Sequence, residues 1–165
     1  MRYILFVFLS ALLFAACSAG DKEITTFILV RHAEKADDGT DDPPLTLQGE
    51  ARAKRLANLF EDASLNALYS THYKRTRLTA EPLSATKNLE VQTYEAFKPE
   101  AIAEMLERHR GGVVFVTGHS NNIPWTANLL LGNNAFADYD ESQYNSILVV
   151  SVVEIGTGSV LRLVY

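Results

Sequence analysis

The amino-acid sequence predicts an α/β protein, a three-layer α/β/α sandwich with a mostly parallel central sheet. Apolar runs suited to strands alternate four times with segments of helical spacing, which is typical of a parallel sheet covered by helices on both faces. The 165 residues are 47% hydrophobic and 21% charged, as in ordinary globular domains. About 150 residues remain after an N-terminal apolar segment, and this length suits one domain with one core.

The first half of the chain provides two strands and two helices. A continuous β-branched and aromatic run is expected to be a buried central strand, and the polar segment after it contains Gly39, Pro43 and Pro44. Apolar residues then recur at the spacing of a helix with one buried face. The expected elements are a strand over 24–30, a loop over 31–44, a helix over 46–62, a strand over 67–69 and a helix over 75–85.

The second half continues the alternation and ends in two strands. Pro99 near its start and Gly111-Gly112 after its end delimit a helix with one apolar face. Residues 156–159 are typical of a turn. The expected elements are a strand over 89–93, a helix over 99–110, a strand over 113–117, a helix over 124–131, and strands over 146–154 and 161–164.

Ligand sites in such sheets lie at the carboxyl ends of the strands. This rule directs attention to the residues after Val30, Tyr69, Thr93 and Thr117. Arginine or histidine follows three of these points, and Glu95 follows the other. We therefore expect the functional side chains to come from these four segments of the chain.

The first strand is followed by Arg31-His32-Ala33-Glu34-Lys35. A histidine at a strand end is held by rigid backbone and is open to a ligand. Arg31 beside it would bind phosphate oxygens and disfavour the protonated imidazolium. A neutral imidazole is a good nucleophile if one ring nitrogen is fixed as a hydrogen-bond donor. The alternative interpretation is a surface dipeptide without a function.

The second candidate is Arg75, which is expected in the first turn of a helix. Peptide N–H groups and the helix dipole also favour an anion at this position. Lys74 and Arg77 are alternative phosphate ligands or solvated charges. His72 could help to bind substrate, or it could be a loop histidine without a role.

The third candidate is His119, which follows an apolar strand and Gly118 and shortly precedes a helix. Gly118 would permit a ligand to approach the backbone closely. His119 could donate a hydrogen bond to a phosphoryl oxygen as charge builds up in the transition state. Ser120 and Asn121 could equally be ordinary residues of a helix start.

Taken together, these segments resemble the histidine phosphatase superfamily, also called the phosphoglycerate-mutase-like family. The resemblance runs from about Ile24 to the C-terminus with the motif order intact, and Leu45-Thr46, Gly49 and Arg52-Ala53 match the stretch common after the first motif. Three elements carry it: Arg31-His32 for the Arg-His-Gly signature, with Ala33 for glycine; Thr71, Arg75 and Thr79-Ala80 for the Ser-x-x-x-Arg-x-x-x-Thr-Ala element, with threonine for serine; and Gly118-His119-Ser120-Asn121 for the second histidine motif.

The resemblance implies a phosphoglycerate-mutase-like domain over residues 24–165 and a phosphate pocket made of Arg31, His32, Arg75 and His119. His32 would attack phosphorus and become phosphohistidine, which water would then hydrolyse. The two arginines and His119 would neutralise charge on the equatorial oxygens. No cofactor and no metal are implied, and no cluster of Cys, His and Asp residues in the sequence argues for a metal.

Members of this family commonly use an acidic residue to protonate the leaving oxygen. Glu95 occupies about the expected place and is the candidate acid, the alternative being an exposed loop carboxylate. A second acidic cluster lies near His32 and is expected to consist of solvated turn formers. Its members are Asp37, Asp38, Asp41 and Asp42.

The sequence thus predicts a phosphomonoester hydrolase that acts on a small phosphorylated substrate. A mutase is less favoured, because the chain between His32 and the last expected strand leaves little for a lid. Two alternatives remain, a catalytically silent envelope lipoprotein that binds a phosphorylated ligand and a structural lipoprotein with a vestigial site. A net charge of −5 without a basic stripe argues against nucleic-acid binding.

Some features near the expected site leave their role open. Residues 132–143 could form a loop that borders the site. The aromatic residues Trp125, Tyr139 and Tyr144 could line a pocket or pack in the core. No residue selects one particular substrate, and the oligomeric state is not determined by the sequence.

The N-terminus has the anatomy of an export signal. Arg2 precedes an apolar run that is shorter than the about 20 residues of a bilayer span, and small residues follow before Cys17. The stretch 14–17 resembles the bacterial lipobox, which implies a signal peptide over 1–16, lipidation of Cys17 and a tether over 17–23. Ser18 favours the outer membrane, on its periplasmic side. A plain signal peptide and an uncleaved signal anchor are the alternatives.

Overall fold

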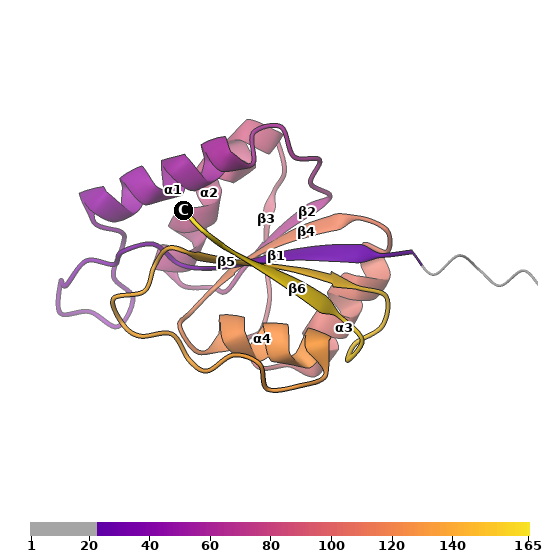
Figure 1. Cartoon of the computed structure of the whole chain (residues 1–165). Coiled ribbons are helices and arrows are strands. Elements are labelled where there is room, and N and C mark those ends of the chain that lie inside the picture. Colours follow the sequence, from indigo (N-terminus) through magenta and orange to yellow (C-terminus); the bar gives the residue numbers. More distant parts are fainter. Residues whose placement is uncertain (1–22) are drawn as a thin grey trace, which may run out of the picture.

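The computed structural model describes residues 23–165, so the expected signal peptide over 1–16 and the expected lipidation site at Cys17 lie outside the described residues. Within 23–165 no helix is both long enough and apolar enough to cross a membrane. The elements, drawn in Figure 1, are β1 (Thr25–Arg31), α1 (Leu47–Leu59), β2 (Ala67–Ser70), α2 (Lys74–Lys87), β3 (Val91–Thr93), α3 (Pro99–Arg108), β4 (Val113–Gly118), α4 (Asn122–Leu131), β5 (Ser146–Val152) and β6 (Ser159–Val164).

The six strands form one mixed sheet in the order β3-β2-β4-β1-β5-β6. β1, β2, β3 and β4 are parallel to one another, and this confirms the expectation of a mostly parallel sheet. β5 lies antiparallel to β1, and β6 lies antiparallel to β5. A short connection around Gly156, whose φ is +89°, joins these last two strands, and such a connection can only serve an antiparallel pair.

Helices cover both faces of the sheet, which confirms the three layers that the sequence predicts. α1 and α2 lie on one face, and α3 and α4 lie on the other (Figure 1). Side chains of β1 alternate between them because successive residues of a strand point to opposite faces. Phe27 and Leu29 join the core under α3 and α4, whereas Ile28 and Val30 join the core under α1 and α2.

The start of α1 connects the core to the loop after β1. Thr46 caps the helix by accepting a hydrogen bond from the Gly49 N–H at 3.0 Å, and its own N–H donates to the Glu34 carbonyl. A β-carbon at Gly49 would lie 2.3 Å from that carbonyl oxygen, so only glycine permits this approach. Arg52 on the next turn binds the Glu34 carboxylate through Nε and Nη2. Residues 31–35 are thereby held against α1.

Helix ends differ from the expected ones by up to three residues. α1 ends at Leu59 instead of Asp62, because the Phe60 N–H turns to the Ala57 carbonyl and the Phe60 ring packs edge-on against Phe115. α4 begins at Asn122, two residues earlier than expected, because the Asn121 side chain accepts its N–H. α3 ends at Arg108, two residues earlier than expected.

β3 is shorter than the strand expected over 89–93. Asn88 adopts a left-handed conformation, with φ of 51°, and caps α2. The N–H of Leu89 then bonds the Ser84 carbonyl, and the Leu89 carbonyl accepts from the Ser84 hydroxyl. Leu89 therefore belongs to the helix cap, and pairing with β2 starts at Val91.

Candidate active site

A cavity of about 470 Å³ opens where β1, β2 and β4 end. Its position agrees with the rule that parallel sheets bind ligands at the carboxyl ends of their strands. All five residues that the sequence suggested for the chemistry lie along its wall, which brings together groups as far apart in the chain as 31 and 119. The wall consists of Arg31, His32, Lys35, Thr71, His72, Tyr73, Arg75, Tyr94, Glu95, Ala96, Phe97, His119, Ser120, Asn121 and Glu141.

His32 is fixed directly after β1, and only 3% of its surface is exposed. Its backbone N–H donates to the Gly118 carbonyl at the end of β4. Its Nδ1 lies 2.7 Å from the Ala33 carbonyl oxygen, and because a carbonyl can only accept, the ring proton resides on Nδ1. Nε2 is then the atom with the lone pair. Burial, followed by the charges of Arg31 and the other cationic neighbours, lowers the pKa of His32 to about 3.

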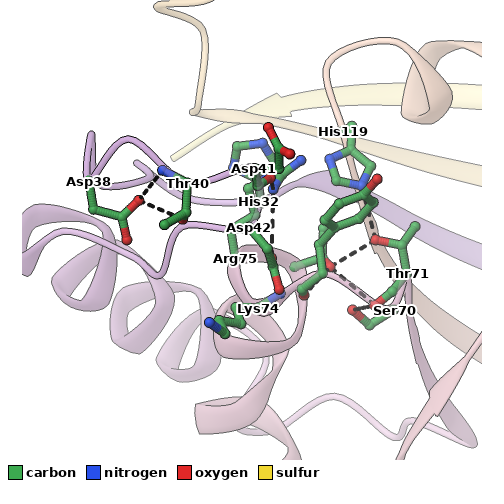
Figure 2. A network of polar contacts seen from close by, with 12 residues as sticks. His32, Asp38, Thr40, Asp41, Asp42, Ser70, Thr71, Lys74, Arg75 and His119 are labelled. Atoms are coloured by element: carbon green, nitrogen blue, oxygen red, sulfur yellow. Dashed lines mark hydrogen bonds and ion pairs between the residues drawn. The ribbon is translucent and has the colours of Figure 1, made fainter.

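His119 approaches His32 from the end of β4. The two ring centroids are 5.5 Å apart with an interplanar angle of 67°, so both rings can contact one small anion. The His119 Nε2 is hydrogen-bonded to the Thr71 hydroxyl at 3.0 Å, as Figure 2 shows, and this contact orients the ring. Burial first, and then the charge of Arg75, lowers the pKa of His119 to about 4.

Arg31 is 2% exposed and is held mainly by main-chain oxygens. Its Nη1 donates to the carbonyls of Asp140, Glu141 and Gln143 at 2.8, 3.2 and 3.1 Å, and its Nη2 donates to the Glu141 carboxylate at 3.0 Å. The guanidinium also lies 4.3 Å from the centre of the Tyr144 ring. Its buried Nε has no hydrogen-bond partner within the described residues.

Arg75 lies in the first turn of α2, as the sequence predicted. Its guanidinium lies 4.3 Å from the centre of the Tyr73 ring and 3.9 Å from the Asp42 carboxylate. Asp42 accepts the Lys74 N–H at 2.8 Å and so caps the helix, a role beyond that of the solvated turn formers expected here, whereas Asp38 closes a turn with Thr40 (Figure 2). The Arg75 Nε is buried without a hydrogen-bond partner among the described residues, like that of the other arginine.

Glu95 lies on the exposed segment between β3 and α3 and lines the cavity. The preceding residue anchors this segment, because the Tyr94 N–H donates to the Ser70 carbonyl and its buried hydroxyl accepts from the Asn122 amide. A carboxylate thus lines the same cavity as the two arginines and the two histidines. Its role as the proton donor remains a prediction.

The structure gives a different reason for glycine at position 118 from the expected one. A β-carbon there would lie 2.5 Å from the Asn122 Oδ1, so the glycine makes room for this side chain and not for a ligand. The Asn122 Oδ1 accepts the His119 N–H at 2.5 Å. Gly118 therefore acts on the site through the backbone of the histidine that follows it.

Other cavity residues carried no signal in the sequence. Lys35, Tyr73 and Phe97 line the wall, but they lie in loops without periodicity. Glu141 also lines it, and it belongs to the stretch 132–143 that could border the site. Of the aromatic residues whose role was open, Tyr139 is buried in the core, Trp125 packs against the core, and Tyr144 faces Arg31 and His32.

The sequence led us to expect neither a cofactor nor a metal. Within residues 23–165, no group of three or more His, Cys, Asp or Glu side chains is placed to hold a metal ion. The donors that line the cavity are mainly cationic or neutral, a set that suits an anion.

Comparison with known proteins gives a family match in the first half of the chain. Residues 27–98 match the model of the histidine phosphatase superfamily, branch 1. Phosphoserine phosphatase 1 of Hydrogenobacter thermophilus is 43% identical over 70 residues, which cover 39% of this chain and 33% of that protein. The similarity thus spans about a third of that relative's length.

Solved structures show the same fold over most of the chain. The protein histidine phosphatase SixA, complexed with tungstate, matches with a TM-score of 0.69 and 18% identity over 84% of this chain and 96% of that one. A mycobacterial glucosyl-3-phosphoglycerate phosphatase matches with a TM-score of 0.68 and 14% identity over 84% and 97% of the two chains. At these identities the likeness concerns the fold, and it includes the second half of the chain.

Proposed function

We propose that the chain, whose residues 27–98 match the histidine phosphatase superfamily model, is a phosphomonoester hydrolase of that superfamily with His32 as the nucleophile. The observation that carries the proposal is the meeting of Arg31, His32, Arg75 and His119 at one cavity. Two arginines in the wall of this cavity suit a phosphoryl group. An imidazole with a free Nε2 lone pair suits attack on its phosphorus.

The proposed reaction has two steps, transfer of the phosphoryl group to His32 and hydrolysis of the phosphohistidine. First, the neutral His32 Nε2 forms a bond to phosphorus, the bond from phosphorus to the ester oxygen breaks, and Glu95 gives its proton to that oxygen. Water then attacks the phosphohistidine, Glu95 takes a proton from it, and the nitrogen–phosphorus bond breaks to release phosphate. Arg31 and Arg75 offset the charge of the phosphoryl oxygens in both steps.

The tautomer of His32 supports this direction of attack. The Ala33 carbonyl keeps the proton on Nδ1 and disperses the positive charge that develops on the ring when Nε2 bonds to phosphorus. A pKa of about 3 means that the ring is neutral at pH 7 before substrate arrives. No proton has to leave the nucleophile before it attacks.

The test is turnover of p-nitrophenyl phosphate by the purified protein. We expect wild type to release phosphate and His32→Ala to release none, whereas His109→Ala, a matched histidine change outside the cavity wall, keeps the activity. Quenching in alkali, which preserves phosphohistidine, should yield a phosphorylated peptide that contains His32. Binding of phosphate without turnover would instead support the silent, ligand-binding alternative.

The role of Glu95 has its own test. In Glu95→Gln we expect turnover of glycerol 2-phosphate to fall by about 100-fold, because the alkoxide leaves poorly without a proton. Turnover of p-nitrophenyl phosphate should fall much less, since p-nitrophenolate is a good leaving group. An equal loss for both substrates, or no loss, would assign the proton transfer to another group.

We propose further that the protein is exported and anchored by a lipid on Cys17, at the periplasmic side of the outer membrane. Support comes from the sequence alone, from Arg2, the apolar run and the small residues before the cysteine. Cells that express the chain and are labelled with a palmitate analogue should label wild type but not Cys17→Ser. Label in neither protein would refute the anchor without touching the hydrolase proposal.

A further inference from the structure

Phe97 is an apolar side chain left half exposed in the cavity wall. It lines the same cavity as the phosphate-binding residues, and 48% of its surface is accessible. The core phenylalanines Phe27 and Phe115 are fully buried. An exposed ring forgoes the stabilisation that burial provides, and its place in a concave wall makes it accessible to a ligand in the cavity.

The backbone of Phe97 is also unfavourable for a residue of its type. Its φ of 59° lies in the left-handed region, which glycine and asparagine tolerate and a bulky side chain does not. Asn88 is the other non-glycine residue with positive φ in the described chain, and it is an ordinary helix cap. Strained backbone positions of this kind cluster at active sites and ligand-binding sites.

The Phe97 ring is held in place by a second aromatic side chain. Trp125 of α4 packs against it with the ring centroids 5.4 Å apart and an interplanar angle of 68°. Across the cavity wall, His72 and Tyr73 lie with their centroids 4.1 Å apart, and Tyr73 stands edge-on to His119 at 5.1 Å. Two loops therefore bring aromatic groups to a cavity whose remaining polar groups suit phosphate.

The proposed role of Glu95 puts the segment after β3 on the leaving-group side of the cavity. Glu95, the proposed proton donor, has to reach the ester oxygen, and Phe97 follows two residues later on the same wall. The substituent on that oxygen would then lie against Phe97. A volume of about 470 Å³ leaves room for more than a phosphate group.

We propose that Phe97 is a binding platform for the leaving group, and that the substrates of this site are phosphomonoesters with an aromatic ring next to the phosphate. This rests on the proposed function. Aromatic rings prefer the offset and edge-on arrangements that a partly exposed, laterally packed phenylalanine offers. An alkyl phosphate gains none of these contacts.

The experiment compares phenyl phosphate with glycerol 2-phosphate in wild type, Phe97→Ala and Phe97→Gly. We expect the ratio of kcat/KM for the two substrates to fall about tenfold in both variants, through KM for phenyl phosphate. Using the ratio cancels the different reactivity of the esters. Glycine relieves the strained backbone and alanine does not, so the two variants should differ in stability. If both variants still show the same ratio of kcat/KM, the change in ratio is not caused by a loss of stability. Leu161→Ala on the remote strand β6 should leave the ratio unchanged.

A binding measurement separates this inference from the hydrolase proposal. Phenylphosphonate and methylphosphonate cannot be hydrolysed, and we expect wild type to bind the phenyl compound about tenfold more tightly and Phe97→Ala to bind both alike. This result without turnover would uphold the platform and refute the hydrolase. Turnover with an unchanged substrate ratio would overturn the platform alone, and the absence of both turnover and phosphonate binding would overturn both proposals.

Discussion

At the scale of single residues, the site is defined by two histidines that stay neutral because of where they lie. His32 and His119 are surrounded by arginines and by apolar atoms, and both effects disfavour a second ring proton. Each ring also has one nitrogen engaged, by the Ala33 carbonyl or by the Thr71 hydroxyl. The two rings are therefore weak bases, but their orientation is fixed.

This has a measurable effect on stability. The pKa of His32 is about 3 in the folded protein and about 6.5 in an unfolded chain, so between these values only the unfolded chain takes up the proton. The free energy of unfolding therefore falls as the pH is lowered through this window, by about 1.4 kcal/mol per pH unit for this group. In His32→Asn, whose amide can still donate to the Ala33 carbonyl, the fall should be shallower by that amount.

Urea unfolding of both proteins at several pH values between 6 and 4 would measure the difference in slope. His119 titrates in both proteins, so its contribution cancels in the comparison. Parallel slopes would show that the His32 ring is protonated in the folded protein as readily as in the unfolded one.

At the scale of elements, the start of α4 determines how His119 is presented. Asn122 in its first turn accepts the His119 N–H and donates to the Tyr94 hydroxyl, so one side chain ties the end of β4 to the segment that carries Glu95. The absence of a β-carbon at Gly118 makes this possible. The end of β4, the start of α4 and the segment after β3 are thus coupled through one amide.

A double-mutant cycle tests this coupling. Gly118→Ala should lower the free energy of unfolding by about 2 kcal/mol, because the new carbon displaces the Asn122 amide and overpacks the turn. In an Asn122→Ala background the same change should cost much less, since the nearest obstacle is gone. Urea unfolding of the four proteins provides the measurement, and strictly additive costs would contradict the contact.

At the scale of the whole molecule, the fold concentrates positive charge at one end of its sheet. The protein carries a net charge of −5, yet Arg31, Lys35 and Arg75 all line one cavity with the two histidines. Glu141 pairs with Arg31 and Asp42 lies near Arg75, but the cationic groups of the cavity outnumber the carboxylates and favour an anion. We therefore expect binding of a phosphate analogue to stabilise the whole domain by linkage.

Orthovanadate at about 100 times its dissociation constant should add about 2.7 kcal/mol to the free energy of unfolding and raise Tm. Arg75→Met keeps an unbranched side chain over Tyr73 but removes one charge, so its Tm without ligand should equal or exceed that of wild type. Most of the vanadate shift should be lost. Arg77→Met, a matched change at an exposed arginine of the same helix, should retain the shift, and thermal unfolding monitored by circular dichroism would measure all three proteins.

Much of the fold could be predicted because it depends on the spacing of apolar residues along the sequence. The run at 24–30 alternates between two cores only because successive strand residues face opposite sides, and the apolar spacing at 46–62 belongs to a helix whatever lies nearby. Boundaries were less accurate where a side chain outside the helix decided them, as Asn121 does for α4 and Phe60 does after α1.

The positions of Arg31, His32, Arg75, Glu95 and His119 at one cavity could also be expected, because carboxyl ends of parallel strands lie along the same edge of a sheet. The sequence by itself thus determined the elements, the layers and the residues that meet at this edge. Only the tertiary structure decided that β5 runs antiparallel beside β1, that the loop before it brings Glu141 onto Arg31, and that Phe97 faces the cavity. Such contacts depend on how non-periodic loops close in space over separations of about a hundred residues, and no local propensity encodes them.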